Sequence, residues 1–190
     1  MKITVKEMTL VSMFAAFACA GGLMLRLGGT GIVPFSILPL VVLLAGLLLG
    51  ARLGAMVMVI YLAIGLIGVP VFSAPPFGGL AYLVKPTAGF LFGFIGGAFV
   101  TGKVVEQFRI KSAVGYIFAS IAGLAVIYLI GLPYLYIVLN YYIGKAVSVV
   151  AVFKIGFLPF IGFDLIKALI TSIIAVQVSK QVKAGRSRDN

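Results

Sequence analysis

Apolar runs of membrane-spanning length follow one another along this sequence, separated by short segments of glycine, proline and basic residues. Residues 113–132 contain no charged side chain, and about 20 such residues cross the hydrocarbon core of a bilayer. Hydrophobic residues make up 63% of the 190 residues and charged residues only 10%, which is outside the range of soluble domains. The runs are apolar on all sides, whereas strands of membrane barrels alternate with period two. We therefore predict an all-α integral membrane protein with about six transmembrane helices.

The boundaries of these helices are expected at clusters of glycine, proline and charged residues. The six expected helices cover residues 6–27, 35–49, 55–69, 88–105, 113–132 and 159–178. Pro70 ends the third and Pro133 closes the fifth, because proline lacks the backbone N–H that a helix interior requires. Residues 134–157 are rich in tyrosine, which favours the headgroup level, so we expect the end of the fifth helix and a short interfacial helix there.

The chain is interpreted as a single transmembrane substrate-binding domain, residues 1–183, followed by a basic cytoplasmic tail, residues 184–190. The segment after the last expected helix, with Lys180, Lys183, Arg186 and Arg188, has the composition of a disordered terminus.

Basic residues are divided unevenly between the two ends of the expected helices. With both termini on one side, that side carries ten of the fifteen Lys and Arg residues: Lys2, Lys6, Arg52, Lys103, Arg109, Lys111, Lys180, Lys183, Arg186 and Arg188. The opposite side carries Arg26, Lys85, Lys145 and Lys154. Because short cytoplasmic segments are enriched in basic residues, both termini are predicted in the cytoplasm. The net charge of +11 then reflects orientation in the membrane, and no nucleic-acid partner is expected.

Two loops and two small-residue faces carry further hypotheses. Residues 28–34 are predicted to form a flexible loop. Residues 71–82 are nearly uncharged, so we expect them to fold over the helix bundle, either as the lid of a pocket or as an interfacial loop.

Gly89 and Gly93 would form a groove open to a flat ligand. Ala16 and Ala20 would allow close approach of another helix, in this chain or in a partner subunit.

The charges of Asp164 and Lys167 lie inside an apolar segment long enough to span the membrane. Charged groups at that depth are costly, so they normally face the protein interior or an aqueous pocket. Three residues apart on a helix, they share a face, with Thr171 one turn further. Two interpretations remain: an ion pair that holds helices together, or a binding site for a polar ligand. The second is favoured, because the pair is expected near the outer surface beneath the apolar loop.

Catalytic and metal chemistry are not indicated. The chain has no histidine and a single cysteine, Cys19, so no Cys/His metal cluster and no internal disulfide can be proposed. The serines lie in no nucleophile motif, and no ATP-binding motif is present. We expect no cofactor, no bound metal and no enzymatic activity.

Three blocks, in order along the chain, resemble the signature segments of the BioY family. They are residues 65–72 (GLIGVPVF), 85–94 (KPTAGFLFGF) and 158–168 (LPFIGFDLIKA). The resemblance implies a six-helix S component of an energy-coupling-factor (ECF) transporter in the prokaryotic cytoplasmic membrane. Such a protein would bind biotin from outside and work with a transmembrane coupling subunit and two cytoplasmic ATPases.

The resemblance also implies residue roles. The charges matching Asp164 and Lys167 are expected to hold the polar part of biotin, and Ala16 and Ala20 match the helix face that docks on the coupling subunit. The expected substrate-binding residues are Gly79, Tyr82, Lys85, Thr87, Gly89, Phe90, Asp164 and Lys167. This chain departs from the family at Lys85, which would attract the ligand's carboxylate, and at Gly162 and Phe163. The alternatives are an S component for another small vitamin and a structural membrane scaffold.

Overall fold

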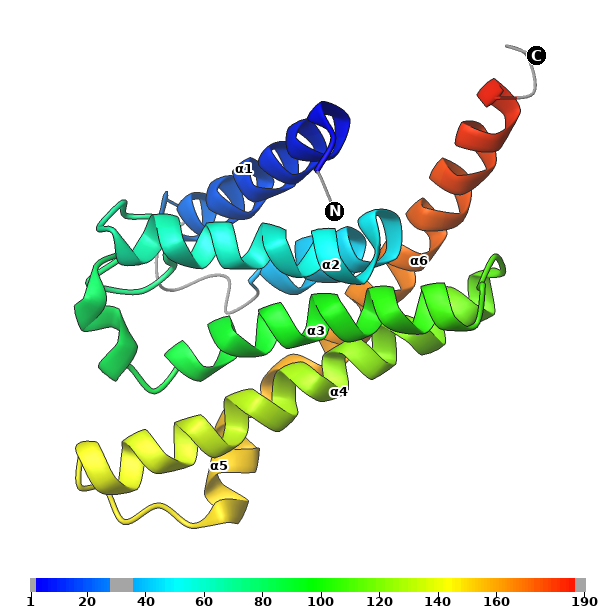
Figure 1. Cartoon of the computed structure of the whole chain (residues 1–190). Helices are drawn as coiled ribbons and strands as arrows, with labels where there is room; N and C mark the ends of the chain where they lie inside the picture. Colours follow the sequence, from blue (N-terminus) through cyan, green and yellow to red (C-terminus); the bar gives the residue numbers. More distant parts are fainter. Residues whose placement is uncertain (1–2, 28–35, 187–190) are drawn as a thin grey trace.

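Every regular element in the described part of the chain is a helix, as the computed structural model shows (Figure 1). The structure describes residues 3–27 and 36–186, so the loop predicted at residues 28–34 lies outside it. The elements are α1 (Val5–Leu27), α2 (Leu38–Leu66), η1 (Leu80–Val84), α3 (Ala88–Gln107), α4 (Ala113–Ile137), η2 (Val138–Tyr142), α5 (Val149–Gly156) and α6 (Leu158–Arg186). Within these ranges, five helices are long and apolar enough to cross a membrane. The predicted all-α membrane fold is confirmed.

The helix α2 consists of two antiparallel arms. Gly50 has φ 83° and ψ −179°, which interrupts the helix, and this positive φ favours glycine. Beyond the break, Gly54 packs on Gly46: a Cβ at Gly54 would lie 3.0 Å from the Gly46 Cα. In one straight helix these residues would be about 12 Å apart, so the chain reverses at Gly50. Residues 38–49 and 51–66 therefore supply the second and third of the six expected helices.

The second arm begins at Ala51, four residues earlier than predicted. The Glu106 carboxylate of α3 accepts a hydrogen bond from the Ala51 N–H at 2.8 Å. This bond satisfies one of the backbone N–H groups that have no partner at the N-terminus of the second arm. A negative charge is favourable at a helix N-terminus. The sequence does not reveal the cap, because Glu106 is 55 positions away.

Two predicted helix ends are wrong. The helix α4 continues through Pro133 to Ile137, so Pro133 does not close it, and its end lies within residues 134–157 as the tyrosine-rich segment predicted. Proline is tolerated inside membrane helices, where neighbouring groups re-satisfy the freed backbone. The helix α6 runs to Arg186, so Lys180, Lys183 and Arg186 belong to a helix and not to a disordered tail. The short helix predicted within residues 134–157 is confirmed as α5.

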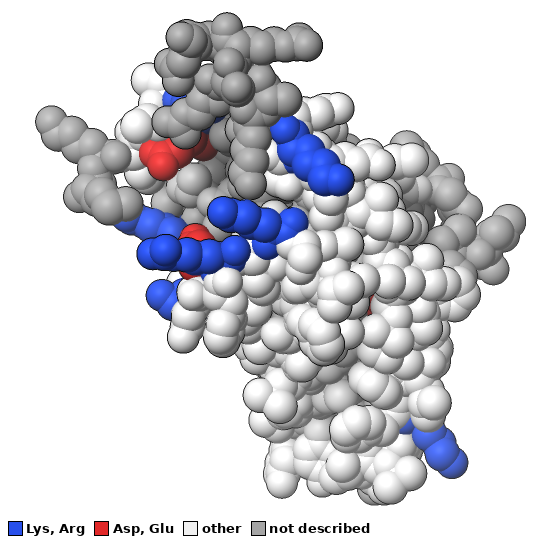
Figure 2. Space-filling model, turned by 90° about the vertical axis from the view of Figure 1, so that its right-hand side faces the viewer, with Lys and Arg blue, Asp and Glu red and all other residues white. Residues whose placement is uncertain are grey.

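The bundle has two chemically different ends. The N-terminus of α1, the Gly50 turn, the α3–α4 connection and the C-terminal end of α6 lie at one end, called here the basic end (Figure 1). Lys and Arg side chains gather there (Figure 2). The other end, called here the loop end, holds residues 67–87, the end of α4 and α5. The assignment of the basic end to the cytoplasm stays a prediction.

The helix α2 connects the bundle. The helix α1 packs on it, α3 packs along it, and α6 packs against both α2 and α4. This arrangement leaves the inward face of α6 buried between α2 and α4, where Asp164 and Lys167 lie.

Candidate ligand-binding site

Asp164 and Lys167 form an ion pair inside the bundle. The Lys167 Nζ donates to the Asp164 Oδ1 at 2.7 Å, and the two side chains are only 14% and 7% exposed, respectively. The Asp164 Oδ2 accepts a hydrogen bond from the Tyr128 hydroxyl of α4 at 2.6 Å. Since a carboxylate accepts about four hydrogen bonds and an ammonium donates three, both charged groups keep capacity for a ligand.

Thr171 shares the helix face of the ion pair but has a different role. Its hydroxyl donates to the backbone carbonyl oxygens of Lys167 and Ala168 at 2.9 and 3.0 Å. These bonds satisfy a buried hydroxyl within α6. Among the described residues, no three acidic or cysteine side chains come together as a metal site.

The charged pair borders a cavity of about 340 Å³. The first residues of α2, the loop of residues 67–87, α3, α4, the end of α5 and the start of α6 surround it. The lining residues are Ser36, Leu38, Pro39, Ser73, Tyr82, Thr87, Phe90, Leu91, Phe94, Ile127, Tyr128, Leu135, Ile155, Gly156, Phe160, Asp164 and Lys167. Mostly apolar walls with a few convergent polar groups are typical of a small-molecule site.

The structure brings five of the eight expected binding residues to this cavity: Tyr82, Thr87, Phe90, Asp164 and Lys167. They come from three separate segments, namely the loop with η1, the start of α3, and α6. Because these five residues line one cavity, their position supports a role in ligand binding, which stays a prediction.

The other three expected binding residues lie outside the cavity lining. Gly79 has φ 83° and its N–H donates to the Gly65 carbonyl at 2.7 Å, so it holds the loop. Lys85 follows η1 and is half-buried. Gly89 meets Tyr134, since a Cβ there would lie 2.2 Å from the Tyr134 Cβ. The open groove predicted at Gly89 and Gly93 is therefore wrong, because α4 fills it.

The loop of residues 67–87 is anchored in the bundle by aromatic rings. Phe72 is 1% exposed, and its ring centroid lies 4.3 Å from that of Tyr82 and 5.7 Å from that of Tyr61. The Tyr61 hydroxyl donates to the Val71 carbonyl at 3.2 Å, and the Tyr134 hydroxyl donates to the Leu83 carbonyl. Tyr82 is thereby fixed as one wall of the cavity.

Sequence reasoning missed Tyr128, Ser36 and Ser73. Tyr128 lies in an uncharged apolar run, where a tyrosine resembles any other core aromatic. Ser36 and Ser73 lie in connecting segments without a motif. A buried carboxylate such as Asp164 needs hydrogen-bond donors. This need, together with the position of Tyr128 on the buried face of α4, is the one signal that could have indicated Tyr128.

Ala16 and Ala20 lie on the exposed face of α1. The opposite face of the helix is buried, with Val11, Ala15 and Ala18 at 2%, 2% and 0% exposure. Within the described residues, the two alanines therefore do not mediate packing inside this chain. Of the two predicted roles for the small-residue face, docking to another subunit stays a prediction.

The fold and cavity define a multi-pass membrane protein with an ion pair beside an internal small-molecule cavity. A profile of the BioY family matches residues 1–184. The chain belongs to the BioY family.

Several relatives share most of this chain's length. A probable biotin transporter BioY from Lysinibacillus sphaericus is 34% identical over 95% of this chain and 90% of its own. The biotin transporter BioY of Thermotoga maritima is 41% identical over 79% of this chain and 83% of its own. A crystal structure of the S-component for biotin from an ECF-type ABC transporter has a TM-score of 0.72, with 23% identity over 94% of this chain and 95% of that chain. The predicted family, fold and membrane location are confirmed.

Proposed function

We propose that this protein binds biotin and takes it up across the cytoplasmic membrane as the S component of an ECF-type transporter. The observation that carries the proposal is the Asp164–Lys167 pair at a 340 Å³ cavity in a chain of the BioY family. The biotin transporters among its relatives support the choice of ligand.

The chemistry of biotin suits this cavity. Its ureido ring carries two N–H donors and a carbonyl, and the remaining lone pairs of Asp164 can accept those N–H groups. The free N–H groups of Lys167 can serve the ureido carbonyl or the valeryl carboxylate. The apolar ring of biotin fits the lining by Phe90, Leu91 and Phe94, which excludes water and strengthens the polar bonds.

Calorimetry on the purified protein tests the ligand. We expect biotin to bind and desthiobiotin, which retains the ureido ring and the carboxylate, to compete. Thiamine and riboflavin should not compete. Competition by thiamine together with absence of biotin binding would assign the protein to another vitamin.

The transport partners are proposed on the same basis: a transmembrane coupling subunit that docks at Ala16 and Ala20, and two ATPases. Ala16→Trp or Ala20→Trp should leave biotin affinity unchanged, because both side chains point away from the bundle. The same change should abolish co-purification of the coupling subunit and biotin uptake. Ala63→Trp, at an exposed alanine of α2, is the matched control, and normal assembly of the α1 variants would contradict the proposed docking face.

A further inference from the structure

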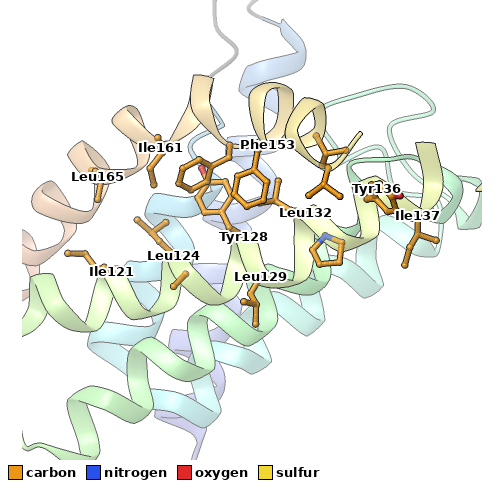
Figure 3. Close-up of a pocket in the computed structure, with 15 residues that line it drawn as sticks. Ile121, Leu124, Tyr128, Leu129, Leu132, Tyr136, Ile137, Phe153, Ile161 and Leu165 are labelled. Carbon is orange, nitrogen blue, oxygen red and sulfur yellow. The ribbon is translucent and has the colours of Figure 1, made fainter. Parts of the chain in front are cut away.

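A second and larger cavity lies on the far side of Tyr128. It has a volume of about 700 Å³ and is bordered by α4, α5 and the start of α6 (Figure 3). Apart from two tyrosines, its fifteen lining residues are wholly apolar. This cavity is called here the apolar groove.

The apolar groove follows α4 along most of the membrane. Its lining runs from Ile121 to Ile137, which is about 24 Å along a helix in a hydrocarbon core about 30 Å thick. Leu129, at the middle of this stretch, is 75% exposed, and Phe153 and Leu165 on the facing elements are 46% and 42% exposed. The groove is therefore open on its outer side to whatever surrounds α4 in the bilayer.

The length and lining of the apolar groove suit a hydrocarbon chain. It follows α4 for about 24 Å, and its walls are almost wholly apolar. An extended acyl chain needs no polar partner along its length, so it matches these walls.

Aromatic rings separate the apolar groove from the ligand cavity. The ring centroids of Phe153 and Phe157 lie 5.8 Å apart, those of Phe157 and Tyr128 4.8 Å apart, and those of Tyr128 and Phe90 6.1 Å apart. Phe153 borders the groove, Phe90 borders the ligand cavity, and Tyr128 borders both. The groove is thus separated by these side chains from the ligand cavity.

Cations and tyrosines flank the groove at the loop end. The segment that joins α4 to α5 carries the exposed Tyr141, Tyr142 and Lys145, and α5 carries the exposed Lys154. Tyrosine and lysine are the residues that favour the headgroup level, and lysines there attract anionic lipids.

We propose that the apolar groove binds one acyl chain of an anionic phospholipid from the leaflet at the loop end, with its phosphate near Lys145 and Lys154. The hydrocarbon surroundings supply the chain, the apolar walls accept it, and the two cations select the charge of its headgroup. This site goes beyond the proposed transport function and does not depend on it.

The absence of tryptophan from the chain provides a direct test. Leu129→Trp places a single fluorophore in the groove, and Phe92→Trp places one on the outward face of α3, beside Tyr134. Both proteins are reconstituted in nanodiscs, and a dibrominated phosphatidylglycerol or phosphatidylcholine is titrated in as quencher. We expect the Leu129→Trp protein to favour the phosphatidylglycerol over the phosphatidylcholine by about tenfold, and the Phe92→Trp protein to be quenched in proportion to mole fraction by either lipid.

Two further variants decide the roles of headgroup and chain. Lys145→Gln and Lys154→Gln, each in the Leu129→Trp background, should lower the phosphatidylglycerol preference by up to about fivefold. Ala125→Phe, which fills the groove, should reduce quenching by both lipids. Identical titrations for Leu129→Trp and Phe92→Trp would show ordinary boundary lipid and overturn the proposal. Loss of quenching on adding saturating biotin would also overturn it, since the groove would then belong to the ligand's path.

Discussion

Several helix glycines meet different partners at the two ends of the bundle. Towards the basic end, a Cβ at Gly102 would lie 2.2 Å from the Ala51 N, and one at Gly46 would lie 2.6 Å from the Ala98 O. Towards the loop end, Gly65, Gly89 and Gly131 meet the rings of Phe72, Tyr134 and Phe90. A Cβ at Gly65 would lie 2.1 Å from the Phe72 ring.

This difference accompanies the position of the ligand cavity, whose lining includes Ser73, Tyr82 and Thr87 of the loop end. Lipid removes most of the hydrophobic driving force between helices, so they associate through close packing of small residues. Backbone against backbone brings helix axes together and leaves no room. A ring seated on a glycine fills the notch but keeps the helices apart, and Phe90, which is seated on Gly131, lines the ligand cavity.

The largest expected effect comes from adding one methyl group at the basic end. Gly102→Ala should lower the free energy of unfolding by about 3 kcal/mol, because the new Cβ meets backbone that cannot move aside. Gly162→Ala is the matched control, since nothing lies within 4 Å of a Cβ there, and it should be neutral or slightly stabilising. Thermal unfolding of both proteins in detergent checks this, and equal melting temperatures would remove the distinction between the two ends.

At the ligand cavity the largest effect is expected on binding. Asp164→Asn removes the charge that pairs with Lys167 and replaces one of the two carboxylate acceptors by an NH2 donor, so biotin affinity should fall by about a hundredfold. Glu106→Gln makes the same chemical change at the basic end and should leave affinity unchanged. Calorimetry and thermal unfolding are measured together. Unchanged affinity with lowered stability would favour the alternative of a structural scaffold.

A smaller effect is expected at the wall between the two cavities. Tyr128→Phe keeps the ring but removes the hydroxyl that donates to Asp164, and biotin affinity should fall by up to about tenfold. Tyr136→Phe, in the apolar groove, should not change it. Equal affinities in the two variants would mean that the Tyr128 hydroxyl does not orient the carboxylate.

The smallest effect is expected at Lys85, which lies outside the cavity lining. Lys85→Gln should slow biotin association by about twofold at low salt, and this difference should disappear at high ionic strength. Lys111→Gln at the basic end serves as control. A large, salt-independent loss of affinity in Lys85→Gln would instead place its ammonium against bound biotin.

The sequence predicted those features that depend on local composition. Runs of apolar residues identified the spans, Gly50 coincides with the predicted break, and the charges of Asp164 and Lys167 were conspicuous in an apolar segment. Each of these signals is complete within a few neighbouring residues.

Features that depend on distant residues were not predictable from the sequence. The early start of the second α2 arm depends on Glu106, the role of Tyr128 depends on Asp164, and the loss of the Gly89 groove depends on Tyr134. The continuation past Pro133 has a related cause, since packing in the membrane overrides the local preference against proline. The 3.6-residue period of a helix predicts which residues share a face, but it does not predict which other helix or loop packs against that face.

The turn at Gly50 also influences the electrostatics of the ligand cavity at the other end of the bundle. Both arms of α2 start from this turn, but residues 38–49 rise about 18 Å and residues 51–66 about 24 Å. The first arm thus stops about 6 Å short of the second, and its N-terminal residues Leu38 and Pro39 line the cavity. Because a helix N-terminus carries about half a positive charge, the cavity favours an anionic ligand group. A longer first arm would carry this positive end away from the ligand.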